Sequence, residues 1–489
     1  MSRRYSIAET YKDETVLITG FTGFLGKVLV EKLLRSCPIR NVAVIVRSKK
    51  GITAEQRVQD IYKQPLFDRL RREKPDFMNK IKVLDGCLED PLMSLLKTDF
   101  DWILENVNLI FHCAATVRFN ETLELATKIN VHGTEKLLLL SKKIMNLKGI
   151  VHVSTIYSHC PRKEICEEYY PVPKVANNDL NNLCANKSLT EILGVWPNTY
   201  TFTKAIAENL LAISNENHLP ISIFRPSIIG CVKSEPQPGW VEGMNGPIAM
   251  VVPFILGLLR ITALSENKKA DIIPVDYTVN ALICVMWDTI NRYQNTNQLN
   301  IKPKIFNYVS SVESPITWDR FFNEMRNNYF EMPPLSAVWY IFCFNTTNVW
   351  GIKILRFFLH WIPALVGDLY LIVTGKKTKM LKMYKKMDIM TDLLYEFTSK
   401  DWTLDNRNTR ELWSLLSDED RISFWFSFEG FDWKSYLRSY MLGIRSYILG
   451  EDQSNLEKAL AKNRRLFWIH NLCIALFVCF VFQVYWIFK

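Results

Sequence analysis

Short apolar runs recur along the first half of the chain, separated by polar and helix-forming stretches. Most are continuous rather than alternating, as expected for parallel strands covered on both faces. The predicted strands are Thr15–Thr19, Asn41–Val46, Ile81–Leu84, Asn108–Cys113, Ile150–Ser154 and Ile221–Arg225. The clearest helical stretches between them are Thr122–Met145 and Thr201–Ser214. This alternation predicts an α/β fold with a doubly wound parallel sheet, in which ligands bind beyond the C-terminal ends of the strands.

Beyond the sixth predicted strand the alternation becomes irregular. Pro236–Gly246 is rich in glycine and proline and predicts a loop, and the apolar stretch Pro247–Leu264 predicts a helix near the substrate. From about residue 333 the chain is rich in Trp, Phe, Leu and Lys without strand and helix alternation. We therefore expect a sheet domain at 1–332, a mostly helical domain at 333–465 and an apolar tail at 466–488.

The tail Leu466–Phe488 contains no Asp, Glu, Lys or Arg. As a helix it would extend about 35 Å, enough to cross a hydrocarbon core of about 30 Å. Four basic residues precede it, and only Lys489 follows: Lys458, Lys462, Arg464 and Arg465. This asymmetry predicts a single-pass C-terminal anchor with the rest of the chain facing the cytosol, in the endoplasmic reticulum or peroxisome membrane. A buried C-terminal helix is the alternative.

A second apolar stretch, Phe357–Thr374, contains His360, Pro363, Gly367 and Asp368, and a lysine-rich run follows it. A carboxylate at the centre of a bilayer is costly. We therefore expect an element that lies at the membrane interface or lines an acyl chain rather than a second span. A plain core helix fits the pattern equally well.

Composition narrows the chemistry. The 489 residues predict at least two domains. With 60 Lys plus Arg against 50 Asp plus Glu, the net charge of +10 favours phosphates, coenzyme A or lipid as partners, although a mildly basic surface also explains it. No basic-aromatic array indicates nucleic acid. Eleven scattered cysteines and seven histidines show no metal-ligand spacing, so we expect no metal. The odd cysteine count and the absence of an apolar leader in Met1–Thr10 predict a reducing compartment.

The first predicted strand leads into a Gly-x-x-Gly-x-x-Gly turn and then a helix, Lys27–Arg35. Such a turn suits a dinucleotide, because the N–H groups and dipole at a helix N-terminus favour a pyrophosphate. Arg47 follows the second strand, where an NAD-binding fold usually carries an acid, so the sequence favours NADPH; a solvated turn is the alternative. The predicted cofactor site comprises Gly20, Thr22, Gly23, Phe24, Leu25, Gly26, Arg47, Asp85, Ala114, Tyr200 and Lys204.

Tyr200 and Lys204 are four residues apart in a predicted helix and therefore share one face. Their phenol and ammonium can together supply a proton, because Lys204 and a positive nicotinamide both favour the phenolate. Ser154 and Thr155 end the fifth predicted strand, and one of these hydroxyls, preferably that of Thr155, could hydrogen-bond a substrate oxygen. Each signal alone also fits a packing role, but together they predict a nicotinamide-dependent reductase.

Six segments of the first 280 residues and one later region carry a resemblance to a known family: Thr19–Gly26, Phe111–Phe119, Val151–Thr155, Tyr200–Lys204, Arg225–Gly230, Ile273–Asp276 and Tyr384–Leu449. The chain resembles the alcohol-forming fatty acyl-CoA reductases of the extended short-chain dehydrogenase/reductase superfamily. The resemblance implies a Rossmann-type sheet with a helical C-terminal domain. It also implies reduction of a long-chain acyl-CoA by two NADPH to a primary alcohol, through an aldehyde and with release of coenzyme A. Chain length and homodimer formation stay open.

Two other interpretations are compatible with parts of this pattern. A membrane-bound sterol or nucleotide-sugar dehydrogenase would share the glycine turn and the Tyr-x-x-x-Lys pair. It would not need the Phe111–Phe119 segment or the Trp-rich second domain. A non-catalytic NADP-binding scaffold at a lipid surface would keep the glycines, but would have no use for a hydroxyl, a phenol and an ammonium together.

Overall fold

The computed structural model describes residues 6–172, 188–214, 219–244, 246–294 and 302–489. Part of the N-terminal segment, residues 1–5, and Asn245 of the predicted loop lie outside these ranges.

The chain forms two compact units, and each is assembled from three separate stretches. The first comprises Met1–Pro238, Asp271–Ser314 and Trp402–Phe431. The second comprises Gly239–Ala270, Pro315–Asp401 and Asp432–Lys489. The expected boundary at residue 332 is a single cut, whereas the chain passes between the units several times. The division into units depends on contacts between residues that are distant in sequence. Changes in composition along the chain do not reveal these contacts.

The first unit is built on a seven-stranded sheet in which all paired strands are parallel. Its strands lie in the order β11-β7-β5-β4-β1-β2-β3. Their bounds are β1 Thr15–Thr19, β2 Asn41–Val46, β3 Ile81–Asp85, β4 Leu109–His112, β5 Gly149–Val153, β7 Ile221–Pro226 and β11 Lys304–Tyr308. The six predicted strands are confirmed to within one residue at each end. Sequence analysis missed β11, a short run that Asn307 interrupts.

The strand order reverses between β1 and β4, and an open α/β sheet binds its ligand at such a switch point. The turn after β1 lies against the end of β4 there. Gly20 has a φ of +81°, which favours glycine, and a Cβ on it would lie 2.6 Å from the Ala114 backbone nitrogen. The glycine therefore lets the two strand ends approach each other.

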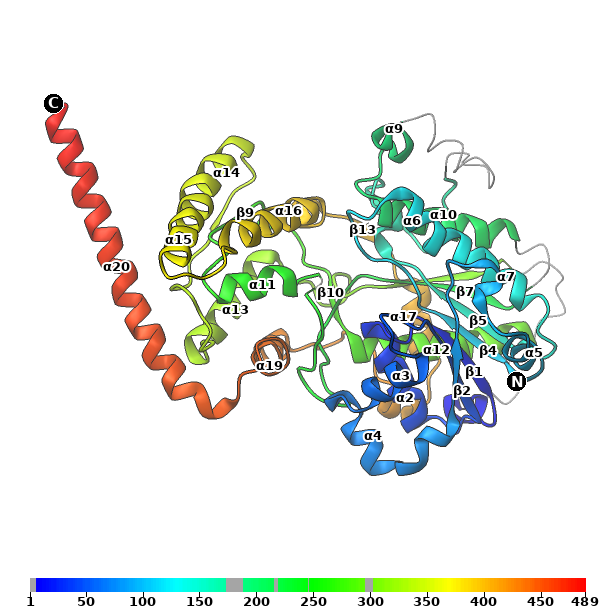
Figure 1. The fold of residues 1–489 in the computed structure, drawn as a ribbon. Helices are drawn as coiled ribbons and strands as arrows, with labels where there is room; N and C mark the ends of the chain where they lie inside the picture. Colours follow the sequence, from blue (N-terminus) through cyan, green and yellow to red (C-terminus); the bar gives the residue numbers. More distant parts are fainter. Residues whose placement is uncertain (1–5, 173–187, 215–218, 245, 295–301) are drawn as a thin grey trace. The chain divides into compact units, whose positions relative to one another are not determined.

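Helices cover both faces of the sheet (Figure 1). The helices of this unit are α1 Ile7–Thr10, α2 Phe24–Ser36, α3 Ala54–Tyr62, α4 Asp68–Glu73, α5 Lys97–Asn106, α6 Leu123–Thr127, α7 Gly133–Ser141, α9 Leu189–Leu193, α10 Thr199–Ser214, α12 Val275–Gln294, α17 Arg407–Ser414 and α18 Asp418–Ser423. Residues of α5, α7 and α10 share one buried apolar cluster with Leu17, Ile110 and Ile223 of the strands. Helix α12 packs on β5 and β7 and against α2. The alternating pattern thus gives the expected doubly wound sheet.

The predicted helix Thr122–Met145 is interrupted. Helices α6 and α7 are joined by a π-helical turn, η4, over Lys128–His132, and the helix ends at Ser141. Asn130 in this turn is fully buried, and its carbonyl accepts a hydrogen bond from the Thr134 hydroxyl at 2.8 Å. The turn changes which residues face the sheet, a feature that simple helical periodicity misses.

The second unit is mostly helical, as expected for the later part of the chain. Its helices are α11 Ile248–Ile255, α13 Trp318–Glu331, α14 Val349–Arg356, α15 Ile362–Val373, α16 Met380–Ser399, α19 Trp433–Gly443 and α20 Leu456–Ile487, with π-helical turns η7 Phe357–Trp361 and η8 Ile444–Ile448. The predicted helix Pro247–Leu264 was wrong in its second half. Gly257 has a φ of +70°, and Ile261–Thr262 forms the short strand β9, paired with β12 Phe344–Asn345.

Among the described residues, two helical segments are long and apolar enough to cross a membrane, Val349–Val373 and Leu456–Ile487. The second continues the predicted tail toward the N-terminus as one helix, α20, drawn in red in Figure 1. Most large apolar side chains beyond Asn471 are exposed. The sequence prediction of an apolar C-terminal helix is confirmed.

The close contact at Gly20 and its left-handed backbone conformation have separate effects on stability. A second glycine with the same conformation but no close neighbour distinguishes them. Gly51 has a nearly equal φ of +78°, but no heavy atom lies within 4 Å of a Cβ built on it. Gly51→Ala should cost about 1–2 kcal/mol for the left-handed conformation alone. Gly20→Ala should cost about 1–3 kcal/mol more, because the methyl group meets the Ala114 backbone. Thermal unfolding of the two detergent-solubilised variants measures the difference, and equal losses would contradict the close approach.

Candidate active site

The β1–α2 turn exposes bare backbone at the N-terminus of α2. Gly23 is the N-cap residue of this helix, and a glycine has no side chain that could occupy the space in front of it. Gly26 is buried, and a Cβ on it would lie 2.3 Å from the Gly20 carbonyl oxygen. The first and third glycines thus pack the turn, while Thr22, Gly23, Phe24 and Leu25 line its more accessible side. Such a cradle fits the pyrophosphate of a dinucleotide.

Arg47 and Asp85 lie at the ends of β2 and β3, and their side chains have different partners. The Arg47 side chain is half exposed and forms an ion pair of 2.7 Å with Glu89. The Asp85 carboxylate accepts hydrogen bonds from the Ser48 backbone nitrogen at 3.0 Å and the Ser48 hydroxyl at 2.6 Å. Asp85 therefore holds the turn that carries Arg47, and the Arg47 side chain is accessible to solvent.

Tyr200, Lys204 and Thr155 converge where β5 ends beside α10. Burial raises the pKa of Tyr200 to about 12, and a hydrogen bond between its phenol and the Thr155 hydroxyl opposes this rise. The Lys204 ammonium is fully buried and donates to the Val153 carbonyl at 2.8 Å. Burial lowers the pKa of Lys204 to about 8, against the opposing effect of the Glu208 carboxylate. The structure thus brings together the phenol, hydroxyl and ammonium that the sequence singled out.

The two candidate hydroxyls of β5 have different partners. Ser154 is buried and donates its hydroxyl proton to the Glu208 carboxylate. Thr155 shares its hydroxyl with the Tyr200 phenol and also accepts from the Tyr157 backbone nitrogen at 3.3 Å. This arrangement supports the preference for Thr155 as the group beside the phenol, and it gives Ser154 a structural partner.

Glu208 is the main residue of the site that sequence analysis missed. Besides Ser154, its carboxylate accepts from the Ser158 hydroxyl at 3.0 Å, from His159 at 2.9 Å and from Arg225 at 2.6 Å. Burial alone would raise its pKa, but the Arg225 and His159 side chains hold the pKa of Glu208 well below its usual range. The signal in the sequence was a third residue at the four-residue spacing of Tyr200 and Lys204.

Asn130 and Phe119 also reach the site without having been predicted. The Asn130 carboxamide accepts from the Thr116 backbone nitrogen at 2.9 Å and donates to the Thr203 hydroxyl at 3.0 Å. It thereby links the loop after β4 to α10. The Phe119 ring stacks on that of Tyr200, with centroids 5.8 Å apart. An asparagine inside an apolar helical stripe was the available signal for the first of these contacts.

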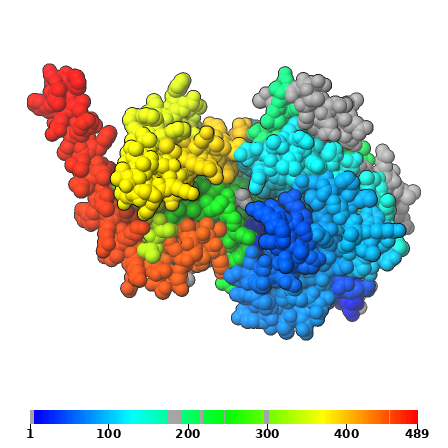
Figure 2. All heavy atoms as spheres, viewed as in Figure 1, coloured from blue at the N-terminus to red at the C-terminus, as the bar shows by residue number. Residues whose placement is uncertain are grey.

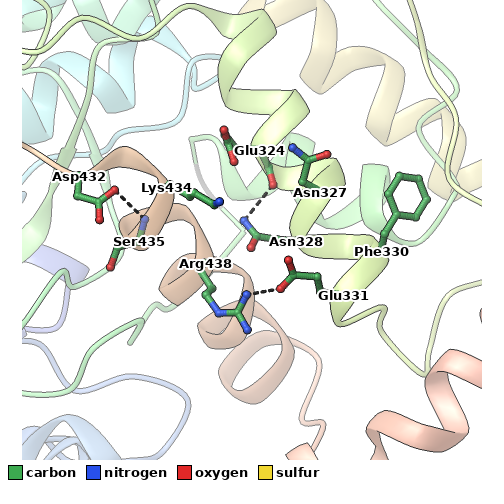
Figure 3. A pocket seen from close by; sticks show the side chains of 9 residues that line it. All are labelled: Glu324, Asn327, Asn328, Phe330, Glu331, Asp432, Lys434, Ser435 and Arg438. Atoms are coloured by element: carbon green, nitrogen blue, oxygen red, sulfur yellow. Dashed lines mark hydrogen bonds and ion pairs between the residues drawn. The ribbon is translucent and has the colours of Figure 1, made fainter.

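Figure 3 shows a different feature, a surface pocket of about 610 Å³ in the second unit. Helices α13 and α19 line it, and the Arg438 guanidinium is paired with Glu331 across it. The pocket contains none of the predicted catalytic or cofactor-binding residues. The exposed pair between Arg438 and Glu331 contributes little to stability.

Two models of the family described as male sterility protein match this chain, an NAD-binding one over residues 18–282 and a C-terminal one over residues 359–451. The fatty acyl-CoA reductase wat of Drosophila melanogaster is 36% identical over 96% of this chain and 90% of its own length. The chain belongs to the fatty acyl-CoA reductase family. The human fatty acyl-CoA reductase 1 is also 36% identical, over 98% of this reductase and 93% of its own length.

Solved structures agree with this fold. A reductase domain of a nonribosomal peptide synthetase from Mycobacterium tuberculosis matches with a TM-score of 0.59 at 18% identity, over 90% of this chain and 92% of its own. The terminal R domain of the myxalamid pathway gives a TM-score of 0.57 at 18% identity, over 88% and 90%. The fatty acyl-CoA reductase resemblance seen in the motifs is confirmed by the relatives that are 36% identical.

The buried Glu208 charge can be tested against an exposed one. Glu208→Gln keeps the shape but leaves the Arg225 guanidinium buried without a counter-charge, which should cost about 3–5 kcal/mol. Asp60→Asn breaks the exposed pair with Lys63 and should cost at most about 1 kcal/mol. Thermal unfolding of both variants measures this contrast. A Glu208→Gln protein as stable as the Asp60→Asn protein would show that the cluster is not a structural centre.

Proposed function

We propose that this chain reduces a long-chain fatty acyl-CoA to the primary alcohol with NADPH, through a bound aldehyde and with release of coenzyme A. The observation that carries the proposal is the convergence of Tyr200, Thr155 and Lys204 beside the dinucleotide-binding edge of the sheet. Membership in the fatty acyl-CoA reductase family supplies the substrate class.

The residues of the site act on the carbonyl oxygen of the substrate. NADPH supplies a hydride to the carbonyl carbon in each of two reductions. The Thr155 hydroxyl and the Tyr200 phenol donate hydrogen bonds to the oxygen as it becomes negative. The first reduction gives a hemithioacetal oxyanion, whose collapse breaks the C–S bond and expels the coenzyme A thiolate. In the second, Tyr200 gives its proton to the alkoxide and later regains one from solvent. The expelled thiolate takes another proton from solvent, so each turnover consumes two protons.

Lys204 adjusts the phenol. With a pKa of about 8 the ammonium is mostly protonated at neutral pH. A positive charge close to the phenol would favour release of the Tyr200 proton. Burial of Tyr200 opposes this by raising the pKa of the phenol to about 12. The phenol therefore keeps its proton until an alkoxide, a much stronger base, forms beside it.

Removing the phenol hydroxyl tests the assignment. Tyr200→Phe should leave NADPH binding nearly intact and lower turnover by about 100-fold or more, because general acid catalysis contributes about that much. Tyr62→Phe is the control, since the Tyr62 hydroxyl is buried and finds no hydrogen-bond partner among the described residues. Turnover of long-chain acyl-CoA and NADPH titration measure the two effects. Turnover of the Tyr200→Phe protein within a few-fold of the unmodified protein would contradict the role of Tyr200 as proton donor. An unmodified protein without turnover would favour the non-catalytic NADP-binding scaffold.

Arg47 is proposed to bind the 2′-phosphate of NADPH. Arg47→Asp should weaken NADPH about tenfold or more while sparing NADH, because it replaces a charge-assisted contact by repulsion. The structure supplies a matched variant, Glu89→Gln, which removes the competing ion pair of 2.7 Å and should strengthen NADPH. The ratio of kcat/KM for the two cofactors measures both changes. An unchanged ratio in both variants would move the role to Lys49 or Lys50.

We further propose that the exposed part of α20 anchors the chain in a membrane, with both units on the cytosolic side. The support is the exposed apolar surface of this helix and the cationic flank at Lys458, Lys462, Arg464 and Arg465. The endoplasmic reticulum and the peroxisome both fit this topology. An enzyme held at a bilayer meets long-chain acyl-CoA where that substrate partitions.

A further inference from the structure

Helices α14 and α15, joined by η7, present a continuous apolar stripe to solvent. We call it the outer face, and it comprises Trp350, Phe357, Phe358, Leu365, Leu369 and Val373. Leu365 is 51% exposed, Leu369 54% and Val373 86%. An exposed stripe of this length on a folded unit indicates an interaction surface rather than a core helix.

The opposite row of the same segment is polar and fixed to the second unit. His360 is fully buried between the Asp388 carboxylate, at 2.9 Å, and the Arg260 backbone nitrogen, at 3.1 Å. The Asp368 carboxylate accepts from the backbone nitrogens at the start of α16, at 2.8–3.0 Å. A transmembrane helix would have to place this row in hydrocarbon and lose these bonds. Only one face of the segment is therefore available to lipid.

Arg260 connects this segment to the point where α20 leaves the unit. Its guanidinium donates to the Leu359 carbonyl at 3.1 Å and lies over the Trp339 and Phe342 rings, 5.5 and 5.7 Å from their centroids. The same two rings contact His470 of α20. Arg260 thus contacts both the α14–α15 segment and the two rings against which α20 packs. In Figure 2 the segment is drawn in yellow and the tail in red.

Basic residues continue the surface. Six exposed lysines follow the outer face in the loop and the first turns of α16: Lys376, Lys377, Lys379, Lys382, Lys385 and Lys386. Lysines close to an anionic leaflet are attracted by its negative surface potential. An anionic phospholipid surface supplies both the apolar layer and the negative charge that the outer face and its lysines match.

We propose that the outer face of α14 and α15 lies flat in the surface of an anionic phospholipid bilayer, as a second membrane contact beside the tail. The contact rests on the proposed tail anchor, which brings the second unit to the membrane. Both ends of the segment stay on the same side of the bilayer, because the polar row with His360 and Asp368 stays bound to the second unit.

Photocrosslinking in the full chain tests this placement. A benzophenone amino acid is placed at Leu369, at Phe477 of the tail as the positive control, or at Ile422, which is 82% exposed in the first unit. The protein is reconstituted into phosphatidylcholine vesicles containing phosphatidylserine and a labelled phospholipid. We expect lipid adducts at Leu369 and Phe477 and none at Ile422. Lys376→Glu together with Lys377→Glu should reduce the Leu369 adduct while sparing that at Phe477.

Other results would overturn the proposal in recognisable ways. An adduct at Phe477 without one at Leu369 refutes the flat contact and leaves the anchor intact, whereas no adduct at either refutes the anchor as well. Adducts of Leu369 with a second copy of the chain would assign the outer face to self-association. Crossing is tested in sealed microsomes with an impermeant amine reagent, which should modify exposed Lys353 and Lys376 equally. Protection of one of them would show that the segment spans the bilayer.

Discussion

One buried negative charge organises the catalytic end of the sheet. The Glu208 carboxylate cannot stay ionised in a dry interior unless donors surround it, and Ser154, Ser158, His159 and Arg225 provide them. These donors come from the end of β5, the turn after it and β7, so a single acceptor fixes three elements against α10. Tyr200 and Lys204 stand on the same face of that helix. Their position relative to the Thr155 hydroxyl therefore depends on this buried carboxylate.

Much of the first unit followed from the sequence because its strands are buried on both faces and therefore appear as uninterrupted apolar runs. The paired motifs Gly20–Gly26 and Tyr200–Lys204 were equally visible, since each is local in sequence. Glu208 was not, because its role depends on donors that folding brings from elsewhere. Asp85 shows the converse: it stands at a strand end where a cofactor contact is expected, yet its carboxylate is used by Ser48.

The membrane side of the molecule shows another limit of composition. The absence of charged residues from Leu466 to Phe488 predicted the start of the apolar tail. The helix begins earlier, at Leu456, and its rings at Phe467 and His470 still contact Tyr340. Packing on the folded unit extends past the point where charge disappears. In the sequence, the cost of placing the Asp368 carboxylate in a bilayer was the argument against a second span. In the structure, three backbone N–H groups donate hydrogen bonds to this carboxylate.

The π-helical turn at Lys128–His132 makes this reductase sensitive to insertions and deletions at one point. A π turn contains one residue more than an α turn, and each residue of an α-helix rotates the next by about 100°. Deleting one residue here would remove the extra residue of the π turn and restore a regular α-helix between α6 and α7. Asn130 would then leave the line joining Thr116 to Thr203. The number of residues in Lys128–His132 is therefore as constrained as their identity.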